Sequence, residues 1–245
     1  MELFDNHRKL FRTATLVFVG LTLLVAIIPA MKVQRNNAPP PGAVPLSEDA
    51  RKGKAVFIAE GCVACHTQQV RNVDMDKVWG ERPGIAADYA DIHRTDFWRN
   101  TATLMGTERT GPDLTNVGVR QPSLDWNLSH LFNPRIVVKE SVMPAYPWLI
   151  RTPVTSERIG ALMSANRTAG VPYTDEMIAA ARADFRAQAD PDAGDVGALM
   201  ERYPKAVARN FDGQPGVSEL DALIAYLQML GTLVDFSTYT PVPSR

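Results

Sequence analysis

The two cysteines of the chain, Cys62 and Cys65, lie three residues apart and are followed immediately by His66. They stand in the stretch EGCVACHTQQVR, and no other cysteine occurs among the 245 residues. A chain of this length with 45% apolar residues can bury a core without disulfide bonds, so a structural disulfide is not the expected use of the pair. We therefore consider which ligand or chemistry two thiols and an adjacent imidazole would serve.

Two common uses of paired cysteines fit the sequence poorly. A structural zinc site needs four ligands, and the remaining histidines are scattered along the chain: His7, His93 and His130. A thioredoxin-like dithiol lies in a strand-to-helix turn, and no strand pattern precedes Gly61. C-x-x-C-H is instead the attachment signature of c-type haem, in which two thioethers fix the vinyl groups and the histidine lies under the iron. We predict one covalently attached haem c, with His66 as its proximal ligand.

The sixth ligand of the iron is expected downstream, and Met143 in the stretch ESVMPAYPWL is the best candidate. Methionine sulfur suits a haem that carries electrons at a raised potential, and the two prolines of this stretch stiffen the loop that bears it. Met105, which precedes a glycine, is the alternative methionine. His93 or His130 would give bis-histidine ligation instead, although a lone histidine on a helix more often has a structural hydrogen bond.

A proximal histidine needs an acceptor that holds the orientation of its ring. The stretch RTGPDL contains a Gly-Pro turn, and we expect its Pro112 carbonyl to accept a hydrogen bond from the His66 ring, as this turn does in many class I cytochromes c. Several arginines are candidates for contacts with haem propionates or with carboxylates of a partner: Arg71, Arg109, Arg120 and Arg135.

The N-terminus differs in character from the rest of the chain. Eighteen residues without a charge, ATLVFVGLTLLVAIIPAM, would span roughly 27 Å as a helix, which is close to the thickness of a bilayer core. We predict a transmembrane anchor at residues 13–31, since Pro29 and the length of the run argue against a cleaved signal peptide that ends at Ala30. A slight excess of basic residues before the run favours a cytoplasmic location for residues 1–12.

Beyond the anchor, residues 32–46 are a proline-rich linker that we expect to be extended. Residues 47–237 are predicted to form one mainly α-helical domain, with a polar insertion at about 188–216 and a C-terminal tail at 238–245. Apolar spacing and capping residues predict helices, and no convincing strand, over these ranges: 48–60, 125–132, 156–165, 174–189, 196–203 and 219–230. The net charge of −1 offers no basic excess for binding nucleic acid.

Beyond C-x-x-C-H, the chain resembles the membrane-anchored monohaem cytochrome c subunit of cbb3-type cytochrome c oxidases, the FixO/CcoO family. The similar stretches run through most of the sequence: EGCVACHTQQVR, RTGPDL, SHLFNPRIVV, ESVMPAYPWL, GVPYTDE and DALIAYLQMLGT. The resemblance implies that Cys62, Cys65 and His66 bind haem c and that Met143 is the sixth ligand. It implies a mainly α, class I cytochrome c-like haem domain with insertions, tethered to a single N-terminal transmembrane helix.

The resemblance also implies a role and partners. Proteins of this family take electrons from a dihaem cytochrome c subunit or a soluble cytochrome c, and pass them to a low-spin haem b in the catalytic haem–copper subunit that reduces oxygen to water. The chain would then be a non-catalytic electron-transfer subunit of an oxidoreductase complex. We expect it in the bacterial inner membrane, with lipid around its anchor and its haem domain in the periplasm, where c-type haem is attached.

Three stretches depart from the usual sequence of the family. Asn72 replaces the proline of Val-Arg-Pro, Glu108 ends the stretch that is usually Trp-Gly-Ser-Lys, and Gln121 ends the stretch that is usually Gly-Gly-Arg-Tyr. A cytochrome c subunit of another haem–copper enzyme, such as a nitric oxide reductase, is therefore the alternative. From a different class, a haem-based sensor would need an exchangeable sixth ligand, and a thiol oxidoreductase would leave both cysteines free to alkylate.

Overall fold

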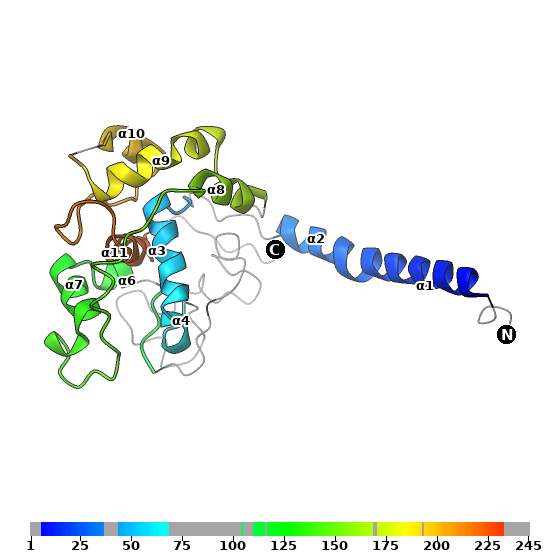
Figure 1. The fold of residues 1–245 in the computed structure, drawn as a ribbon, viewed down its shortest axis with the longest axis horizontal. Coiled ribbons are helices and arrows are strands. Elements are labelled where there is room, and N and C mark those ends of the chain that lie inside the picture. The colour runs from blue at the N-terminus through cyan, green and yellow to red at the C-terminus, as the bar shows by residue number, and fades with distance from the viewer. Residues whose placement is uncertain are drawn as a thin grey trace. The chain divides into compact units, whose positions relative to one another are not determined.

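The chain folds into two compact units, one that contains the N-terminal helix and one that contains the remaining helices (Figure 1). The computed structural model describes residues 6–36, 44–68, 104, 110–115, 117–168, 171–192 and 194–232. Within these residues the structure is helical and contains no strand, which confirms the predicted mainly α fold class. Several sequence-based predictions fall outside the described residues, namely those at Arg71, Asn72, His93, Met105, Glu108 and Arg109, part of the linker and the C-terminal tail.

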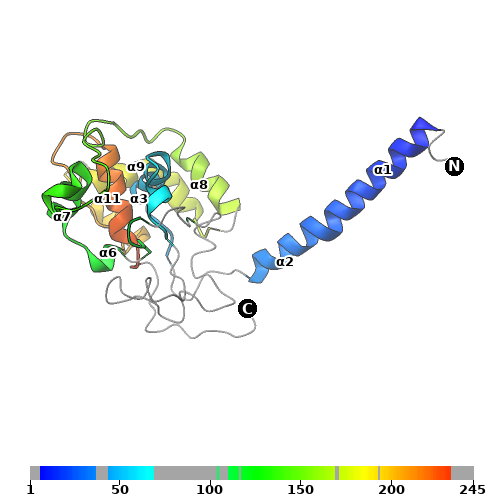
Figure 2. The same cartoon turned by 90° about the horizontal axis from the view of Figure 1, so that it is seen from below.

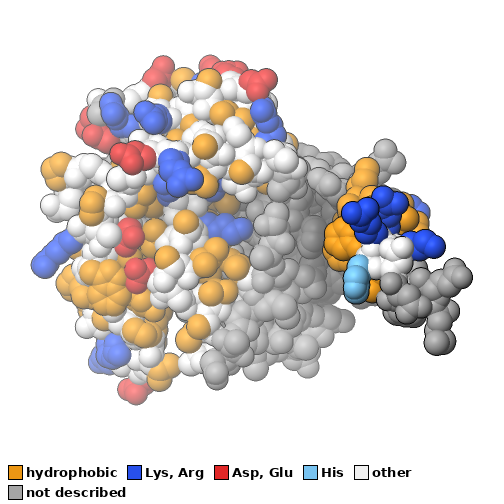
Figure 3. All heavy atoms as spheres, turned by 45° about the vertical axis from the view of Figure 1, so that its right-hand side comes forward, with side chains coloured by type: hydrophobic (Ala, Val, Ile, Leu, Met, Phe, Trp, Pro, Cys, Tyr) orange, Lys and Arg blue, Asp and Glu red, His pale blue; other side chains and the backbone are white. Residues whose placement is uncertain are grey.

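The first unit is a continuous helical segment. It comprises α1 (His7–Leu21), a short stretch of wider π-type turns, η1 (Thr22–Ile27), and α2 (Ile28–Asn36). Among the described residues, one segment is long and apolar enough to cross a membrane, the 26 residues from His7 to Lys32. None of it is buried inside the protein, and its large apolar side chains are exposed along the helix. Figure 3 looks toward one end of this helix, where Lys and Arg side chains gather in front of apolar ones. This surface suits a single membrane anchor, and the helix continues to Asn36, past the predicted end of the anchor at residue 31.

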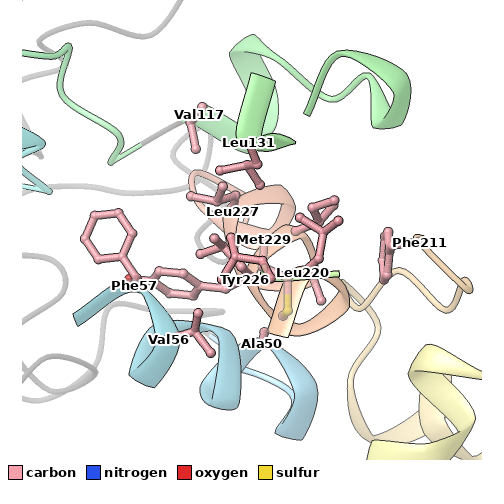
Figure 4. Close-up of a cluster of buried hydrophobic side chains, with 14 of the residues drawn as sticks. Ala50, Val56, Phe57, Val117, Leu131, Phe211, Leu220, Tyr226, Leu227 and Met229 are labelled. Atoms are coloured by element: carbon pink, nitrogen blue, oxygen red, sulfur yellow. The ribbon is translucent and has the colours of Figure 1, made fainter. Parts of the chain in front are cut away.

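The second unit is built around the crossing of α3 (Glu48–Ala59) and α11 (Glu219–Met229). Ala50, Val56 and Phe57 of α3 point toward α11, where the Tyr226 ring meets the Phe57 ring edge to face at a centroid distance of 6.0 Å (Figure 4). The two helices approach closely because α3 has a glycine at the crossing: a Cβ on Gly53 would lie 1.8 Å from the carbonyl oxygen of Ala222.

The burial of these two helices differs in part from the prediction. The spacing of leucines predicts an apolar stripe on one side of α11, whereas nine of its residues are buried, including Ala222 and Ala225. The helix is therefore covered on nearly all sides, because other helices pack over the face that α3 leaves free. In α3, Phe57 is buried, whereas the neighbouring Ile58 is 47% exposed.

Two groups of helices lie on either side of this crossing (Figures 1 and 2). The first group contains α4 (Cys62–Cys65), α6 (Val117–Arg120), α7 (Leu124–Phe132) and the short 3-10 turn η2 (Pro134–Ile136), and both α6 and α7 pack on α11. The second contains α8 (Ile159–Thr168), α9 (Asp175–Ala189) and α10 (Val196–Arg202), and α9 also packs on α3.

The second group of helices has a hydrophobic core of its own. Its members include Ile159 and Met163 of α8, Phe185 of α9 and Leu199 of α10. The predicted helix over 156–165 instead begins at Ile159, because Arg158 adopts a left-handed φ of 60° that interrupts a right-handed helix.

Candidate haem-binding site

The C-x-x-C-H motif lies where the chain leaves α3. Gly61 has a left-handed φ of 75°, a conformation in which glycine avoids the steric cost of a Cβ, and it redirects the chain into the single turn α4. This turn contains both Cys62 and Cys65, which are partly buried and free, and it closes with a 2.9 Å hydrogen bond from the His66 N–H to the Cys62 carbonyl. The two thiols and the imidazole therefore come from one turn of backbone.

The ring of His66 has a fixed partner on one side. Its Nδ1 lies 2.9 Å from the carbonyl oxygen of Pro112, so Nδ1 carries the hydrogen and donates it. Nε2 is then the unprotonated nitrogen, which is the form that binds a metal. Burial lowers the pKa of His66, and this further favours the neutral imidazole. The structure thus places Pro112 where the predicted acceptor should be.

The segment that contains Pro112 runs alongside the motif. Gly111 N–H donates to the Cys65 carbonyl at 3.1 Å, and Leu114 N–H donates to the Thr67 carbonyl at 2.8 Å. Gly111 also lies against the imidazole, since a Cβ at this position would be 2.2 Å from Cε1 of His66. A distance below 3.0 Å is not found between real Cβ atoms and their neighbours, so a side chain here would displace the ring. The sequence indicates the Gly-Pro turn, but not this close approach across 45 residues.

Met143 lies on the segment that follows α7. Its N–H donates to Ser141 Oγ at 3.3 Å, and its carbonyl accepts from the Arg135 guanidinium at 3.3 Å. Three residues later, Tyr146 N–H donates to the carbonyl of Leu131 in α7 at 3.0 Å. The Met143 side chain is partly buried and packs against the same hydrophobic cluster as Cys62. Met143 and Cys62 therefore lie against the same hydrophobic core.

Two aromatic residues join the Met143 segment to the end of α3. The Trp148 indole N–H donates to Glu60 Oε2 at 3.0 Å, and Glu60 is two residues before Cys62. Tyr146 and Trp148 pack edge to face with a centroid distance of 5.3 Å. Burial raises the pKa of Tyr146, and the cysteines of the attachment turn shift it in the same direction. The sequence contains no signal for the contact between Trp148 and Glu60.

His130, the alternative ligand on α7, also lies near the site. Its ring stacks on Trp126 at a centroid distance of 4.3 Å, and its buried Nδ1 has no hydrogen-bond partner in the structure. Burial, together with the neighbouring His66, lowers the pKa of His130 to about 4. Of the arginines predicted to contact propionates or a partner, Arg120 donates to the carbonyl of Asp113 at 3.0 Å.

These residues fit a covalently attached haem. Two free thiols stand beside an imidazole whose Nε2 remains available, and Gly111 leaves the space that the imidazole occupies. In the ranges that the structure describes, no three histidine, cysteine or acidic side chains are grouped so that they could hold a metal ion. Burial raises the pKa of Cys62 to about 11, whereas a thiol oxidoreductase needs a thiolate near neutral pH.

The family of the chain follows from a comparison with protein-family models. The model of the mono-haem cytochrome c oxidase subunit, FixO, matches residues 1–234. The chain belongs to the FixO family. Membership identifies it as a mono-haem cytochrome c subunit of a cbb3-type oxidase that associates with other subunits of that enzyme. The match includes the membrane-suited helix as well as the haem-site motifs, so the resemblance found in the sequence is confirmed. No curated protein matches the chain in a direct sequence comparison.

Proposed function

We propose that the chain relays single electrons through one covalently attached haem c to the haem b of the catalytic oxidase subunit, which reduces oxygen to water. In this proposal Cys62 and Cys65 form the thioethers, His66 is the proximal ligand and Met143 is the sixth ligand. The observation that carries it is the Nδ1 contact of His66 with Pro112, which leaves Nε2 available beside two free thiols. FixO membership supports the oxidase as the partner.

When bound, the haem supplies a reversible one-electron couple between ferric and ferrous iron. The side chains of the protein would determine which oxidation state of the iron is favoured and whether other ligands can reach the iron. The Pro112 carbonyl orients the His66 ring, because the Nδ1 hydrogen bond limits its rotation. Met143 would provide a soft thioether, which favours ferrous iron more than a second imidazole does. With Met143 as the sixth ligand, no position on the iron would remain open to oxygen, so we expect no substrate chemistry in this subunit.

The electron donor and the location are part of the same proposal. We infer that the donor is a dihaem cytochrome c subunit or a soluble cytochrome c. The apolar helix at residues 7–32 anchors the chain in the bacterial inner membrane, with its N-terminus in the cytoplasm and the haem domain in the periplasm. The support for this orientation is the basic group before the anchor and the periplasmic site of c-type haem attachment.

The covalent attachment can be tested with the full-length protein. Acid–acetone removes non-covalent haem, so the wild-type protein should retain one haem per chain in a pyridine haemochrome assay after extraction. The variant Cys62→Ala plus Cys65→Ala should retain none, because the sequence has no other cysteine. Haem staining of this variant after denaturing electrophoresis would refute covalent attachment through the motif.

A further inference from the structure

The Met143 segment needs more than the iron bond to stay in place. A thioether is a weak ligand for ferric iron, so the fraction of protein in which Met143 is detached depends on how firmly the protein holds the segment. Several contacts hold it to α7 and its following loop, including the donations to Leu131 and Ser141 described above. These contacts are local to α7 and the loop that follows it. They do not connect the segment to the turn that contains the cysteines.

The bond between Trp148 and Glu60 makes that connection. Trp148 follows Met143 by five residues and Glu60 precedes Cys62 by two, so a single 3.0 Å hydrogen bond joins the segments that carry the two predicted axial ligands. The donor is the indole N–H and the acceptor is a carboxyl oxygen of Glu60. The Tyr146 ring packs on the Trp148 ring at 5.3 Å and limits its motion.

Trp148 and the residue after it differ in burial. Its side chain is 46% exposed, whereas the next residue, Leu149, is 1% exposed and anchors the backbone in the core. The Leu149 carbonyl accepts from the N–H of Leu220 in α11 at 3.2 Å. The backbone at the end of the segment is therefore fixed independently of the indole. The indole is directed toward Glu60 and away from the core.

We propose that Trp148 and Glu60 are positioning residues that form a clamp between the Met143 segment and the end of α3, and that this clamp would keep Met143 on the iron of a bound haem. This inference rests on the proposed function, because it assumes that Met143 is the sixth ligand. The clamp acts by holding the segment, and neither residue is proposed as a ligand of the iron. Its loss should increase the fraction of ferric protein in which Met143 is detached while leaving the haem attached.

Binding of free imidazole to the ferric full-length protein in detergent measures this fraction. Imidazole binds only when Met143 is detached, so its apparent affinity rises in proportion to the open population. One hydrogen bond of ordinary net strength corresponds to an effect of about three- to tenfold. Trp148→Phe keeps the aromatic contact with Tyr146 and removes the N–H, and Glu60→Ala removes the acceptor. Each variant should bind imidazole about three- to tenfold more tightly than the wild type.

Further variants separate the clamp from a general loss of stability. Glu60→Gln keeps an oxygen acceptor, so this variant should bind imidazole nearly as weakly as the wild type does. Glu140→Ala removes an exposed carboxylate from the loop before Met143 and should change nothing. The double variant Glu60→Ala plus Trp148→Phe should bind imidazole no more tightly than the single variants, because both remove the same bond.

Several outcomes would overturn the clamp. The clamp is wrong if Trp148→Phe and Glu60→Ala bind imidazole like the wild type, or if the effects of the two substitutions add in the double variant. It is also wrong if the increase in imidazole affinity is fully explained by a loss of global stability, measured as a lower urea midpoint of unfolding. A different result would overturn the proposed function instead. A wild-type protein without covalent haem, or without the weak red charge-transfer band of a methionine–ferric haem bond, would refute the ligands themselves.

Discussion

At the scale of single residues, the site depends on a glycine that has no chemistry of its own. Gly111 allows the segment before Pro112 to lie flat against the His66 ring, while Pro112 accepts the hydrogen bond from Nδ1. The two neighbours thus act together: one provides the space for the ring and the other sets its rotation. A side chain at position 111 should therefore change the orientation of the His66 ring.

Substitution of Gly111 by alanine should disturb the proximal ligand. The added Cβ would lie 2.2 Å from Cε1 and 2.6 Å from Nδ1 of His66, so the ring must move and its bond to Pro112 must break. We expect at least half of the purified Gly111→Ala protein to lack haem, and the remainder to have a shifted Soret band. Haem content per chain, from the pyridine haemochrome, measures the effect.

Thr110→Ala is the matched control for this prediction. Thr110 is the residue before Gly111 and is exposed, so its truncation should leave the haem content and the Soret band unchanged. A Gly111→Ala protein with full haem content and a wild-type spectrum would show that the ring tolerates the Cβ, contrary to the contact distance.

At the scale of helices, local signals predict the ends of elements well, and burial less well. Ser218 caps α11 in a reciprocal arrangement with Asp221, as its position before the leucine pattern indicates. Ser47 likewise precedes α3, yet its side chain accepts no hydrogen bond from that helix, and its hydroxyl donates to the sulfur of Met229. The capping pattern of Ser218 and Asp221 lies within four residues and is local, whereas Met229, the partner of Ser47, is 182 residues away in the sequence.

The same distinction explains what the sequence predicts of the site. The motif residues and Met143 carry chemistry that is visible in their residue types and spacing. The contacts that orient them join distant segments: Pro112 with His66 over 46 residues and Trp148 with Glu60 over 88. The first follows from a known Gly-Pro turn, but nothing in the sequence indicates the second. Glu60 belongs to no sequence motif from which Trp148 could be predicted as its hydrogen-bond partner.

The crossing of α3 and α11 leads to a prediction about stability. Gly53→Ala would place a Cβ 1.8 Å from the Ala222 carbonyl and 2.7 Å from Cβ of Tyr226, both parts of a rigid helix. The helices must separate, so we expect the free energy of unfolding to fall by about 3 kcal/mol. Urea unfolding of the full chain in detergent, followed by circular dichroism, measures the loss.

Gly160→Ala in α8 provides the comparison, because the nearest atom to its added Cβ is 3.4 Å away. Alanine favours a helix more than glycine does, so this variant should gain up to about 1 kcal/mol. Equal stability of the two variants would mean that the helix crossing relaxes without cost.

At the scale of the whole second unit, the first turn of α3 joins its two hydrophobic cores. The helix itself belongs to the core around α11, while Leu46, just before it, accepts a 3.0 Å hydrogen bond from the hydroxyl of Tyr173 in the other core. Glu48 lies between them with a fully buried side chain. Its Oε2 is 3.4 Å from the Arg51 guanidinium, and its Oε1 has no hydrogen-bond partner.

This buried carboxyl should make the stability of the protein depend on pH. Burial raises the pKa of Glu48 from 4.5 to about 7, and the pairing with Arg51 offsets only part of the shift. An acid with a raised folded pKa contributes most stability below its unfolded pKa of 4.5, and the contribution is lost as pH rises through 7. At 1.36 kcal/mol per pKa unit, the loss is about 3 kcal/mol.

Glu48→Gln isolates this contribution, because glutamine has nearly the same shape and does not ionise. The free energy of unfolding of the variant minus that of the wild type should rise by about 3 kcal/mol between pH 4.5 and pH 8. Glu157→Gln, at an exposed position before α8, should run parallel to the wild type across this range. Urea unfolding at half-unit steps of pH gives both curves. A Glu48→Gln curve that stays parallel to the wild type would show that the carboxyl remains ionised in the folded protein, and that its contact with Arg51 outweighs its burial.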